Sequence, residues 1–237
     1  MRVLVTGGTR GIGRACVEYF VARGDRVAFL YHFRQDLAEE LSRRTGALCF
    51  CADVAEPEAV RRAMSSVVDF FGGIDVLINN AGISQIKLFT DLTDEDWRNM
   101  IDTNLSGAFY VTREAIKPMI SQKFGRIVFV GSMWGKVGAS CEVHYSATKA
   151  ALRGMTKALA KEVGPSGITV NCVEPGVILT DMNRELGEEI LKELREETPI
   201  GRLGTPQEVA ALIGFLASEE AGFITGQAMG IDGGYAL

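Results

Sequence analysis

Residues 2–13 read RVLVTGGTRGIG, a mostly apolar run that passes directly into a glycine-rich turn. Gly7, Gly11 and Gly13 follow the spacing G-x3-G-x-G. A glycine-rich turn between a strand and a helix lets the main chain bend tightly, and it leaves the N–H groups of the first helical turn available to a phosphate. The stretch therefore predicts a strand, a phosphate-binding loop and the start of a helix.

The same alternation of strand and helix continues along the chain. Short apolar runs typical of buried strands lie at 26–31, 47–54, 75–82, 125–132, 168–176 and 227–234. Helical patterns lie between them at 13–24, 34–46, 57–71, 94–107, 142–164 and 205–218. Strands that are apolar nearly throughout and alternate with helices are typical of a parallel sheet covered on both faces. We predict a doubly wound, Rossmann-like α/β fold that forms a single domain over residues 1–237.

Two of these helices have recognisable start signals. Thr205, Pro206 and Glu208 have the residue types expected at the N-cap, the first and the third position of a helix. Thr93 with Asp96 three residues later is a weaker form of the same pattern. We therefore expect helices to begin directly after Thr93 and Thr205.

Composition argues against several classes of protein. Hydrophobic residues make up 47% and charged residues 23% of the 237 residues, as in an ordinary globular protein. No apolar run approaches the roughly 20 residues that span a bilayer, and the first residues lack the pattern of a signal peptide. A net charge of −5 argues against a nucleic-acid-binding surface. We expect neither a membrane nor a nucleic acid as a partner.

Cysteine and histidine usage points to a reducing compartment. The five cysteines are an odd number without a C-x2-C pair, and the chain has two histidines. This argues against a disulfide framework and a metal site. We expect a cytoplasmic protein that holds no metal.

The residues after the second predicted strand bear on cofactor choice. An NAD site normally has an acidic residue there, which binds the ribose 2′-hydroxyl. Here the chain reads YHFRQD at 31–36, so His32 and Arg34 come first and Asp36 follows at the predicted helix start. Arg34 alone is equally typical of a solvated helix start. Together with Arg10 in the phosphate loop it favours the 2′-phosphate of NADP(H) over NAD(H), because guanidinium pairs well with phosphate.

The stretch HYSATKAAL at 144–152 places Tyr145 and Lys149 four residues apart in a predicted helix. That spacing puts both side chains on one face. If the pair is buried, the ammonium should favour the phenolate and lower the tyrosine pKa from its usual value of about 10, as a proton donor requires. The alternative is a surface pair that arises by chance.

These motifs resemble those of the short-chain dehydrogenase/reductase family over essentially the whole chain. TGGTRGIG at 6–13, NNAG at 79–82, Ser132 and Tyr145-x3-Lys149 follow in the family's order, with Asn104 between the second and third. The resemblance implies a catalytic tetrad of Asn104, Ser132, Tyr145 and Lys149. It further implies cofactor binding by Gly7, Thr9, Arg10, Gly11, Ile12, Gly13, His32, Arg34, Asp53, Val54, Asn80, Ala81, Gly82, Tyr145, Lys149, Pro175, Gly176, Ile178 and Thr180.

Within that resemblance each group has an expected role. Ser132 would hold the substrate carbonyl near Tyr145, which would donate a proton while hydride arrives from the nicotinamide. Lys149 would lower the tyrosine pKa and bind the ribose hydroxyls. The amide of Asn104 would interrupt a regular helical bond and hold a water that relays protons from Lys149.

Four further residues stand near the expected site. His144 points about 100° away from its neighbour Tyr145 around the helix, so we expect it to line the pocket at most. Cys141 and Trp134 are expected to shape the substrate cleft. Glu174 is unusual directly before Pro-Gly, and we expect it to face solvent or another subunit.

The carboxyl-terminal run PIGRLGTPQEV at 199–209 and ITGQAMGIDGG at 224–234 resembles the 3-oxoacyl-acyl-carrier-protein reductases. That resemblance implies reduction of a β-ketoacyl thioester. Carrier proteins are acidic, so basic residues are expected beside the cleft. The two positions that the family often uses hold Lys123 and Ser166 here.

Other interpretations remain open at this stage. SQIKLFTDLTDEDW at 84–97, WGKVGASCEV at 134–143 and TDMN at 180–183 resemble reductases of the 5-aminopentanone group on elongation factor P. A catalytically silent NADP-binding scaffold is a third possibility. The family resemblance also implies a homotetramer, or alternatively a homodimer, formed through helices near 94–118 and 143–163 and the carboxyl-terminal segment.

Overall fold

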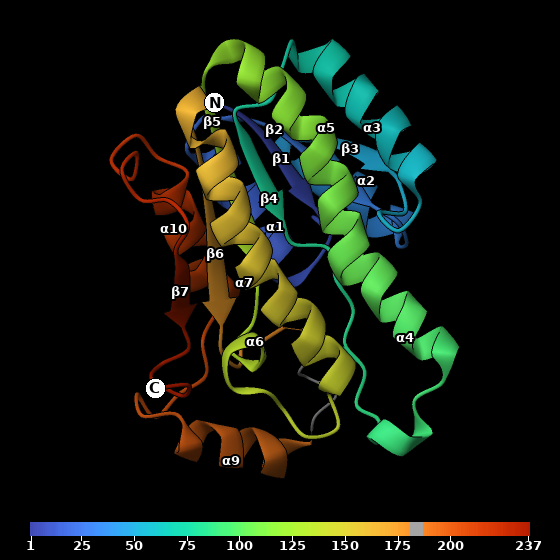
Figure 1. Ribbon diagram of the computed structural model, residues 1–237, viewed down its shortest axis with the longest axis vertical. Helices are drawn as coiled ribbons and strands as arrows, with labels where there is room; N and C mark the ends of the chain where they lie inside the picture. The colour runs from blue at the N-terminus through green and yellow to red at the C-terminus, as the bar shows by residue number, and fades with distance from the viewer. Residues whose placement is uncertain (181–186) are drawn as a thin grey trace.

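The computed structural model describes residues 1–180 and 187–237 (Figure 1). Seven parallel strands of the described residues form one sheet in the order β3-β2-β1-β4-β5-β6-β7. Strand order reverses between β1 and β4, which opens a crevice at the carboxyl edge of the sheet. The predicted doubly wound, Rossmann-like fold is confirmed. The strands are β1 (Arg2–Thr6), β2 (Arg26–Tyr31), β3 (Leu48–Cys51), β4 (Val76–Asn79), β5 (Gly125–Val130), β6 (Ile168–Pro175) and β7 (Ala228–Ile231).

Helices cover both faces of this sheet. One hydrophobic core lies between the sheet and the helices α3 (Pro57–Phe71), α5 (Gly107–Gln122) and α7 (Val143–Val163). A second core lies under α1 (Gly11–Ala22), α2 (Gln35–Thr45) and α10 (Pro206–Leu216). Every residue of β4, β5 and β6 is buried, as the continuous apolar runs predicted. Figure 1 shows α5 and α7 crossing in front of the sheet.

Both predicted helix starts are confirmed. The Thr205 hydroxyl accepts a hydrogen bond from the Glu208 N–H at 3.3 Å, and the Glu208 carboxylate accepts one from the Thr205 N–H at 2.8 Å. The same reciprocal bonds join Thr93 and Asp96 at the start of α4 (Asp94–Ile101). Each capping box satisfies main-chain donors that the first helical turn leaves unpaired.

The expected helix over 94–107 is not continuous. It ends at Ile101, passes through a π-helical turn η2 (Asp102–Ser106), and resumes as α5. Such single wide turns are uncommon and occur often at functional sites. Asn104 lies in this turn, where its amide was expected to interrupt a regular helical bond, although the wide turn itself was not predicted.

Several short elements were not predicted. They are η1 (Phe89–Asp91), α6 (Trp134–Val137), η3 (Gly164–Ser166) and α9 (Glu188–Glu197). No residue of α9 is buried, and Leu191 and Leu194 are its half-buried apolar side chains. Figure 1 shows α6 and α9 beyond the carboxyl ends of β6 and β7, where they border the crevice edge of the sheet.

Within the described part of the chain, no helix is long and apolar enough to cross a bilayer. In that same part, no cluster of three or more histidine, cysteine or carboxylate side chains could bind a metal ion.

Candidate active site

The loops that follow β1 and β4 are joined side by side at the carboxyl edge of the sheet. The Thr6 hydroxyl accepts hydrogen bonds from the N–H groups of Asn80 and Ala81, both at 2.9 Å. The side-chain amide of Asn80 in turn donates to the main-chain oxygens of Thr6 at 3.0 Å and Gly7 at 3.1 Å. The TGGTRGIG and NNAG motifs therefore form one hydrogen-bonded unit.

Gly13 shows why this loop requires glycine. A Cβ atom there would lie 2.1 Å from the Gly7 oxygen and 2.5 Å from Nδ2 of Asn80. The first turn of α1 also has no acidic residue and no side-chain cap, so its N–H groups and the positive end of the helix dipole are available to an anion. These features fit the pyrophosphate of a dinucleotide.

The remaining loop residues divide between core and surface. Thr9 is buried, and Ile12 packs against the core beneath α1. Arg10 is exposed at the N-cap of α1. Thr180 lies opposite this turn, because its Cγ2 would be 3.3 Å from a Cβ added at Gly11. Thr180 therefore faces the Gly11 position of the loop.

The residues expected at the adenosine ribose follow β2. The His32 ring stacks on Phe33 with 3.8 Å between ring centroids, and its Nδ1 lies 3.5 Å from Oδ2 of Asp53. Arg34 has a left-handed main chain, with φ of 60°, at the N-cap of α2. Its guanidinium donates two hydrogen bonds to Asp36, at 3.0 and 2.8 Å.

This bidentate pair changes the electrostatics expected at the ribose. Arg34 holds the pKa of the Asp36 carboxyl below its usual value, and Asp36 compensates part of the positive charge of Arg34. The sequence favoured binding of a 2′-phosphate by Arg10 together with Arg34. The structure instead places an acceptor next to it that a 2′-phosphate would have to displace or share.

Asp53 and Val54 follow β3, as expected for residues beside an adenine. Oδ1 of Asp53 accepts a hydrogen bond from the Ala55 N–H at 2.9 Å, which holds the turn after the strand. Val54 is buried, and a Cβ at Gly107 of α5 would lie only 2.9 Å from its side chain. Val54 therefore fixes α5 against this end of the sheet.

Three of the four expected catalytic residues lie together beyond β5. Ser132 is buried directly after β5, and its hydroxyl accepts a hydrogen bond from the Trp134 N–H at 3.2 Å. Lys149 is buried on α7, donates to the Val130 oxygen at 2.8 Å, and lies over the Tyr145 ring. The predicted helical face is therefore turned toward the end of β5.

The electrostatics of this cluster differ from the sequence-based expectation. Burial raises the pKa of Tyr145 to about 12, and this effect exceeds the lowering by its hydrogen bond with Ser132. Burial also lowers the pKa of Lys149 to about 8. The net shift of the Tyr145 pKa is therefore upward, whereas the sequence predicted a lowered pKa, because loss of hydration dominates at this buried position.

Asn104, the fourth expected residue, lies in the π-helical turn. Its Oδ1 accepts from the Ile83 N–H at 2.8 Å, and its Nδ2 donates to the Ile83 oxygen at 2.9 Å. A Cβ at Gly82 would lie 3.1 Å from Oδ1 of Asn104 and 3.6 Å from Nζ of Lys149, so these groups are close neighbours. Both polar atoms of the Asn104 amide bond to Ile83, and these bonds fix the chain after NNAG.

His144 belongs to a polar chain that was not predicted. Its Nε2 lies 3.0 Å from Oε1 of Gln85, and the Gln85 amide donates to Asp96 at 2.8 Å. Lys87 donates to the same carboxylate at 2.7 Å. Burial lowers the pKa of His144, so the ring is neutral near pH 7. These hydrogen-bonded side chains connect the first turn of α7 to the capping box at the start of α4.

The segment between Ser132 and Tyr145 packs against distant parts of the chain. The Trp134 ring meets Tyr235 edge to face, with 5.7 Å between centroids. Tyr235 donates a 2.5 Å hydrogen bond to Glu197 of α9. The Cys141 oxygen accepts from the Lys87 N–H at 2.8 Å. No sequence signal identified Tyr235 as a link between α6 and α9.

Glu174 does not face solvent, which corrects that part of the expectation. It lies on β6 beneath α7 and is 3% exposed. Its Oε1 lies 3.0 Å from Nε of Arg153 on α7. Burial raises its pKa and Arg153 opposes that shift. The residue is buried because β6 is an interior strand covered by a helix.

The end of β6 leads into the chain expected beside the nicotinamide. Pro175 closes the strand, and a Cβ at Gly176 would lie 2.7 Å from the Asp232 Cα, so the turn packs tightly on the end of β7. Ile178 is buried and bridges to Gly204. Residues 181–183 of the TDMN stretch lie outside the described residues.

Lys123 and Ser166 do not lie beside this cleft. They precede β5 and β6, at the amino ends of the strands, whereas Ser132 follows β5. The six residues of β5 span about 20 Å. The expectation of a basic residue next to the chain's own cleft is therefore wrong for these two positions.

Comparison with known proteins agrees with this geometry. The family model described as enoyl-(acyl carrier protein) reductase matches residues 7–236. The chain is 41% identical over 236 residues to the 3-oxoacyl-(acyl-carrier-protein) reductase FabG of Aquifex aeolicus, covering 98% of this chain and 95% of the relative. It is 43% identical over 232 residues to the acetoacetyl-CoA reductase of Shinella zoogloeoides, covering 98% and 96%.

A solved structure supports the same assignment. The short-chain dehydrogenase/reductase from Serratia marcescens BCRC 10948 superposes with a TM-score of 0.93 at 35% identity, covering 100% of this chain and 98% of the other. The protein therefore belongs to the short-chain dehydrogenase/reductase family of oxidoreductases.

Proposed function

We propose that this protein is an NADPH-dependent ketone reductase whose substrate is a 3-oxoacyl thioester carried on acyl carrier protein. The observation that carries the proposal is the cluster of Ser132, Tyr145 and Lys149 at the edge of the sheet that also holds the glycine loop. The names of two relatives, 3-oxoacyl-(acyl-carrier-protein) reductase and acetoacetyl-CoA reductase, support a thioester with a 3-oxo group.

The chain fits NADP(H). Gly7, Gly13 and the uncapped start of α1 would hold the pyrophosphate, with Asn80 supporting the loop. Arg34 and the exposed Arg10 would bind the 2′-phosphate, as charge-assisted guanidinium bonds. The nicotinamide supplies the hydride that reduces the carbonyl carbon.

The side chains supply the proton and hold the carbonyl. The hydroxyl of Ser132 donates a hydrogen bond to the carbonyl oxygen and keeps it next to Tyr145. Tyr145, with a pKa near 12, carries its proton throughout the neutral range and donates it to the oxygen as the alcohol forms. Lys149, with a pKa near 8, is mostly charged at pH 7 and stabilises the phenolate that results. Asn104 keeps residues 82–83 against Lys149.

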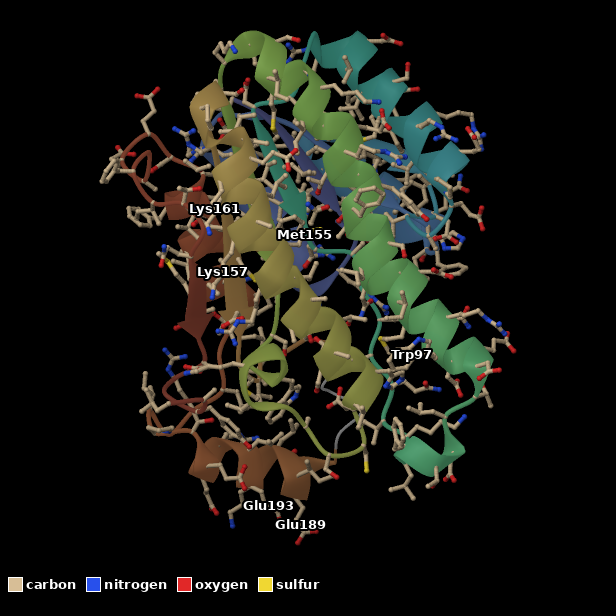
Figure 2. All side chains as sticks on the ribbon, in the orientation of Figure 1. Trp97, Met155, Lys157, Lys161, Glu189 and Glu193 are labelled. Atoms are coloured by element: carbon tan, nitrogen blue, oxygen red, sulfur yellow. The ribbon has the colours of Figure 1, made fainter. Side chains whose placement is uncertain are left out.

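We also propose that copies of the chain associate through α4, α5 and α7. Trp97 on α4 is 42% exposed and Phe109 on α5 is 46% exposed. Figure 2 shows Trp97 on α4 and Met155 on α7 on the face that these helices form. Large apolar side chains gathered on one face favour burial against a second copy.

The test is an NADPH-consumption assay with purified protein. Acetoacetyl thioesters of acyl carrier protein and of coenzyme A should be reduced, and elongation factor P carrying the 5-aminopentanone group is assayed beside them as the competing substrate. Faster reduction of the modified elongation factor would replace the carrier-protein assignment. Absence of NADPH oxidation with every ketone would refute ketone reduction itself.

A further inference from the structure

The proposed proton donor Tyr145 lies in the first turn of α7, where the helix has no side-chain cap. Glu142 at the N-cap forms no cap bond, so this turn gains no stabilisation from its own cap residue. His144, directly before Tyr145, is completely buried, and its Nε2 lies 3.0 Å from Oε1 of Gln85. The side chain next to the donor therefore connects the start of α7 to the segment that follows NNAG.

Asp96 determines where the His144 ring carries its hydrogen. The amide nitrogen of Gln85 donates to Oδ1 of Asp96 at 2.8 Å, which turns the amide oxygen toward the ring. An amide oxygen can only accept, so Nε2 of His144 has to carry the hydrogen and donate it. The tautomer of the ring is thus assigned from the carboxylate two bonds further along this hydrogen-bonded series.

Asp96 is itself fixed as an acceptor. Its Oδ2 accepts hydrogen bonds from Nζ of Lys87 at 2.7 Å, from the Thr93 hydroxyl at 2.8 Å and from the Thr93 N–H at 2.9 Å. Lys87, followed by Gln85 and Thr93, holds the pKa of the Asp96 carboxyl far below its usual range. The carboxylate therefore remains ionised in the neutral range, and the direction of the bonds from His144 to Asp96 stays the same.

The second nitrogen of the ring explains why His144 is neutral. Nδ1 is buried and has no hydrogen-bond partner among the described residues. A proton on Nδ1 would create a charged ring with a buried donor that lacks an acceptor, which is costly. Burial lowers the pKa of His144, Asp96 opposes this shift and Lys87 adds to it. The neutral ring with its hydrogen on Nε2 is the form that fits this environment.

The segment after NNAG is also held beside Lys149. Both the N–H and the oxygen of Ile83 bond to the Asn104 amide, at 2.8 and 2.9 Å. A Cβ at Gly82 would lie 3.6 Å from Nζ of Lys149. Asn104 and His144 therefore hold this segment at two points, one beside the lysine and one at the start of α7. Loss of the His144 bond would release the second point and leave the first.

We propose that His144 is a positioning residue that holds the Tyr145 hydroxyl against the substrate carbonyl through its hydrogen bond to Gln85. The proposal rests on the ketone reductase function proposed above and deepens it. His144 acts through Gln85 and the first turn of α7, and it takes no part in the transfer of hydride or proton.

The tautomer is tested without any measurement of activity. His32 and His144 are the two histidines of the chain, so isotope-labelled histidine in protein without an affinity tag gives two ring systems in NMR spectra, assigned with His32→Gln. We expect His144 to be neutral with its hydrogen on Nε2 at neutral pH, and to gain a second proton only below the ordinary value of about 6.5. A hydrogen on Nδ1 at neutral pH would overturn the proposal.

The positioning role is tested with paired variants. His144→Leu removes the donor but keeps an apolar side chain, and His144→Gln supplies an amide N–H of similar reach. With acetoacetyl coenzyme A, we expect His144→Leu to lower kcat about tenfold and to leave the KM for NADPH unchanged within about twofold, because a misplaced donor slows the chemical step. His144→Gln should restore most of kcat.

A double variant identifies Gln85 as the partner. Gln85→Leu should lower kcat as much as His144→Leu does, and the combination of the two should cause no further loss, because each replacement removes the same hydrogen bond. Additive losses would show that His144 does not act through Gln85, and they would contradict the proposal.

Thr156 provides a matched control on the same helix. It is buried, and its hydroxyl donates to the Leu152 oxygen at 2.8 Å, roughly three turns beyond Tyr145. Thr156→Val should lower the free energy of unfolding without changing kcat. Wild-type kcat in His144→Leu, equal losses in His144→Leu and His144→Gln, or an equal loss in Thr156→Val would each overturn the positioning role.

Failure of this proposal is distinct from failure of the function on which it rests. If the wild-type protein reduces acetoacetyl coenzyme A and His144→Leu does so with the same kcat, only the role of His144 fails. If the wild-type protein oxidises NADPH with no ketone, both proposals fail.

Discussion

The ammonium nitrogen of Lys149 lies 5.5 Å from the centroid of the Tyr145 ring, one helical turn away on α7. Burial moves the two groups in opposite directions, raising the pKa of Tyr145 to about 12 and lowering that of Lys149 to about 8. At neutral pH the phenol therefore keeps its proton while most of the lysine keeps its charge. That combination suits a proton donor beside a cation that stabilises its conjugate base.

Replacing Tyr145 by Phe should remove the proton donor and leave the glycine loop intact. We expect kcat for ketone reduction to fall by about 10³-fold, within the usual range for loss of a general acid. NADPH binding, followed by the change in its fluorescence, should be unchanged within about twofold, because the pyrophosphate site is built from other residues. Turnover close to wild type would exclude Tyr145 as the donor.

The rate of reduction should depend on the charge of Lys149. The charged form is present below its pKa of about 8 and is lost above it, so kcat/KM should be constant in the neutral range and fall as pH rises through about 8. A pH–rate profile from 6 to 10 measures this. Lys149→Met should lose both the falling limb and most of the activity. A wild-type profile that stays flat to pH 10 would contradict the requirement for a charged lysine.

Nucleotide choice should depend on Arg34 and its partner Asp36. Arg34→Ala should raise the KM for NADPH about tenfold and leave that for NADH unchanged, since a charge-assisted bond to the 2′-phosphate is lost. Asp36→Asn should lower the KM for NADPH, because the carboxylate no longer competes for the guanidinium. Arg43→Ala, on the exposed side of α2, serves as the control and should change neither value. Equal effects on NADPH and NADH would place Arg34 away from the 2′-phosphate.

Removing either partner of the ion pair between Glu174 and Arg153 should be destabilising, mainly because the other partner is left as a buried charge without a counter-ion. Glu174→Met or Arg153→Met should lower the free energy of unfolding by about 3 kcal/mol, whereas the double replacement by methionine should recover much of that loss. Urea denaturation of the single and double variants measures the coupling. Lys192→Ala removes an ion pair with Glu196 in which both side chains are exposed. This control should change the free energy of unfolding little. Additive single and double effects would show that the two residues do not interact.

Local patterns were sufficient for most of the fold. Continuous apolar runs predicted the buried strands, because both faces of a parallel sheet are covered and no alternation with polar residues survives. Capping residues such as Thr205 and Glu208 marked helix starts, since the bonds that stabilise them join residues three apart. Glycine spacing predicted the loop where Gly13 has no room for a Cβ.

Only the tertiary structure determined the contacts of the site residues and the protonation of Tyr145 and Lys149. Asn104 bonds to Ile83, and Glu174 lies under α7. Both contacts join elements that are separate in the sequence. Arg34 bonds to Asp36, which is only two residues away. Loss of hydration, which sets the pKa of Tyr145, is a property of everything packed around a group. Sequence spacing by itself placed Tyr145 and Lys149 on one face of a helix. Only the packing of that helix on β5 determined their protonation, because hydration and charge partners come from segments far apart in the chain.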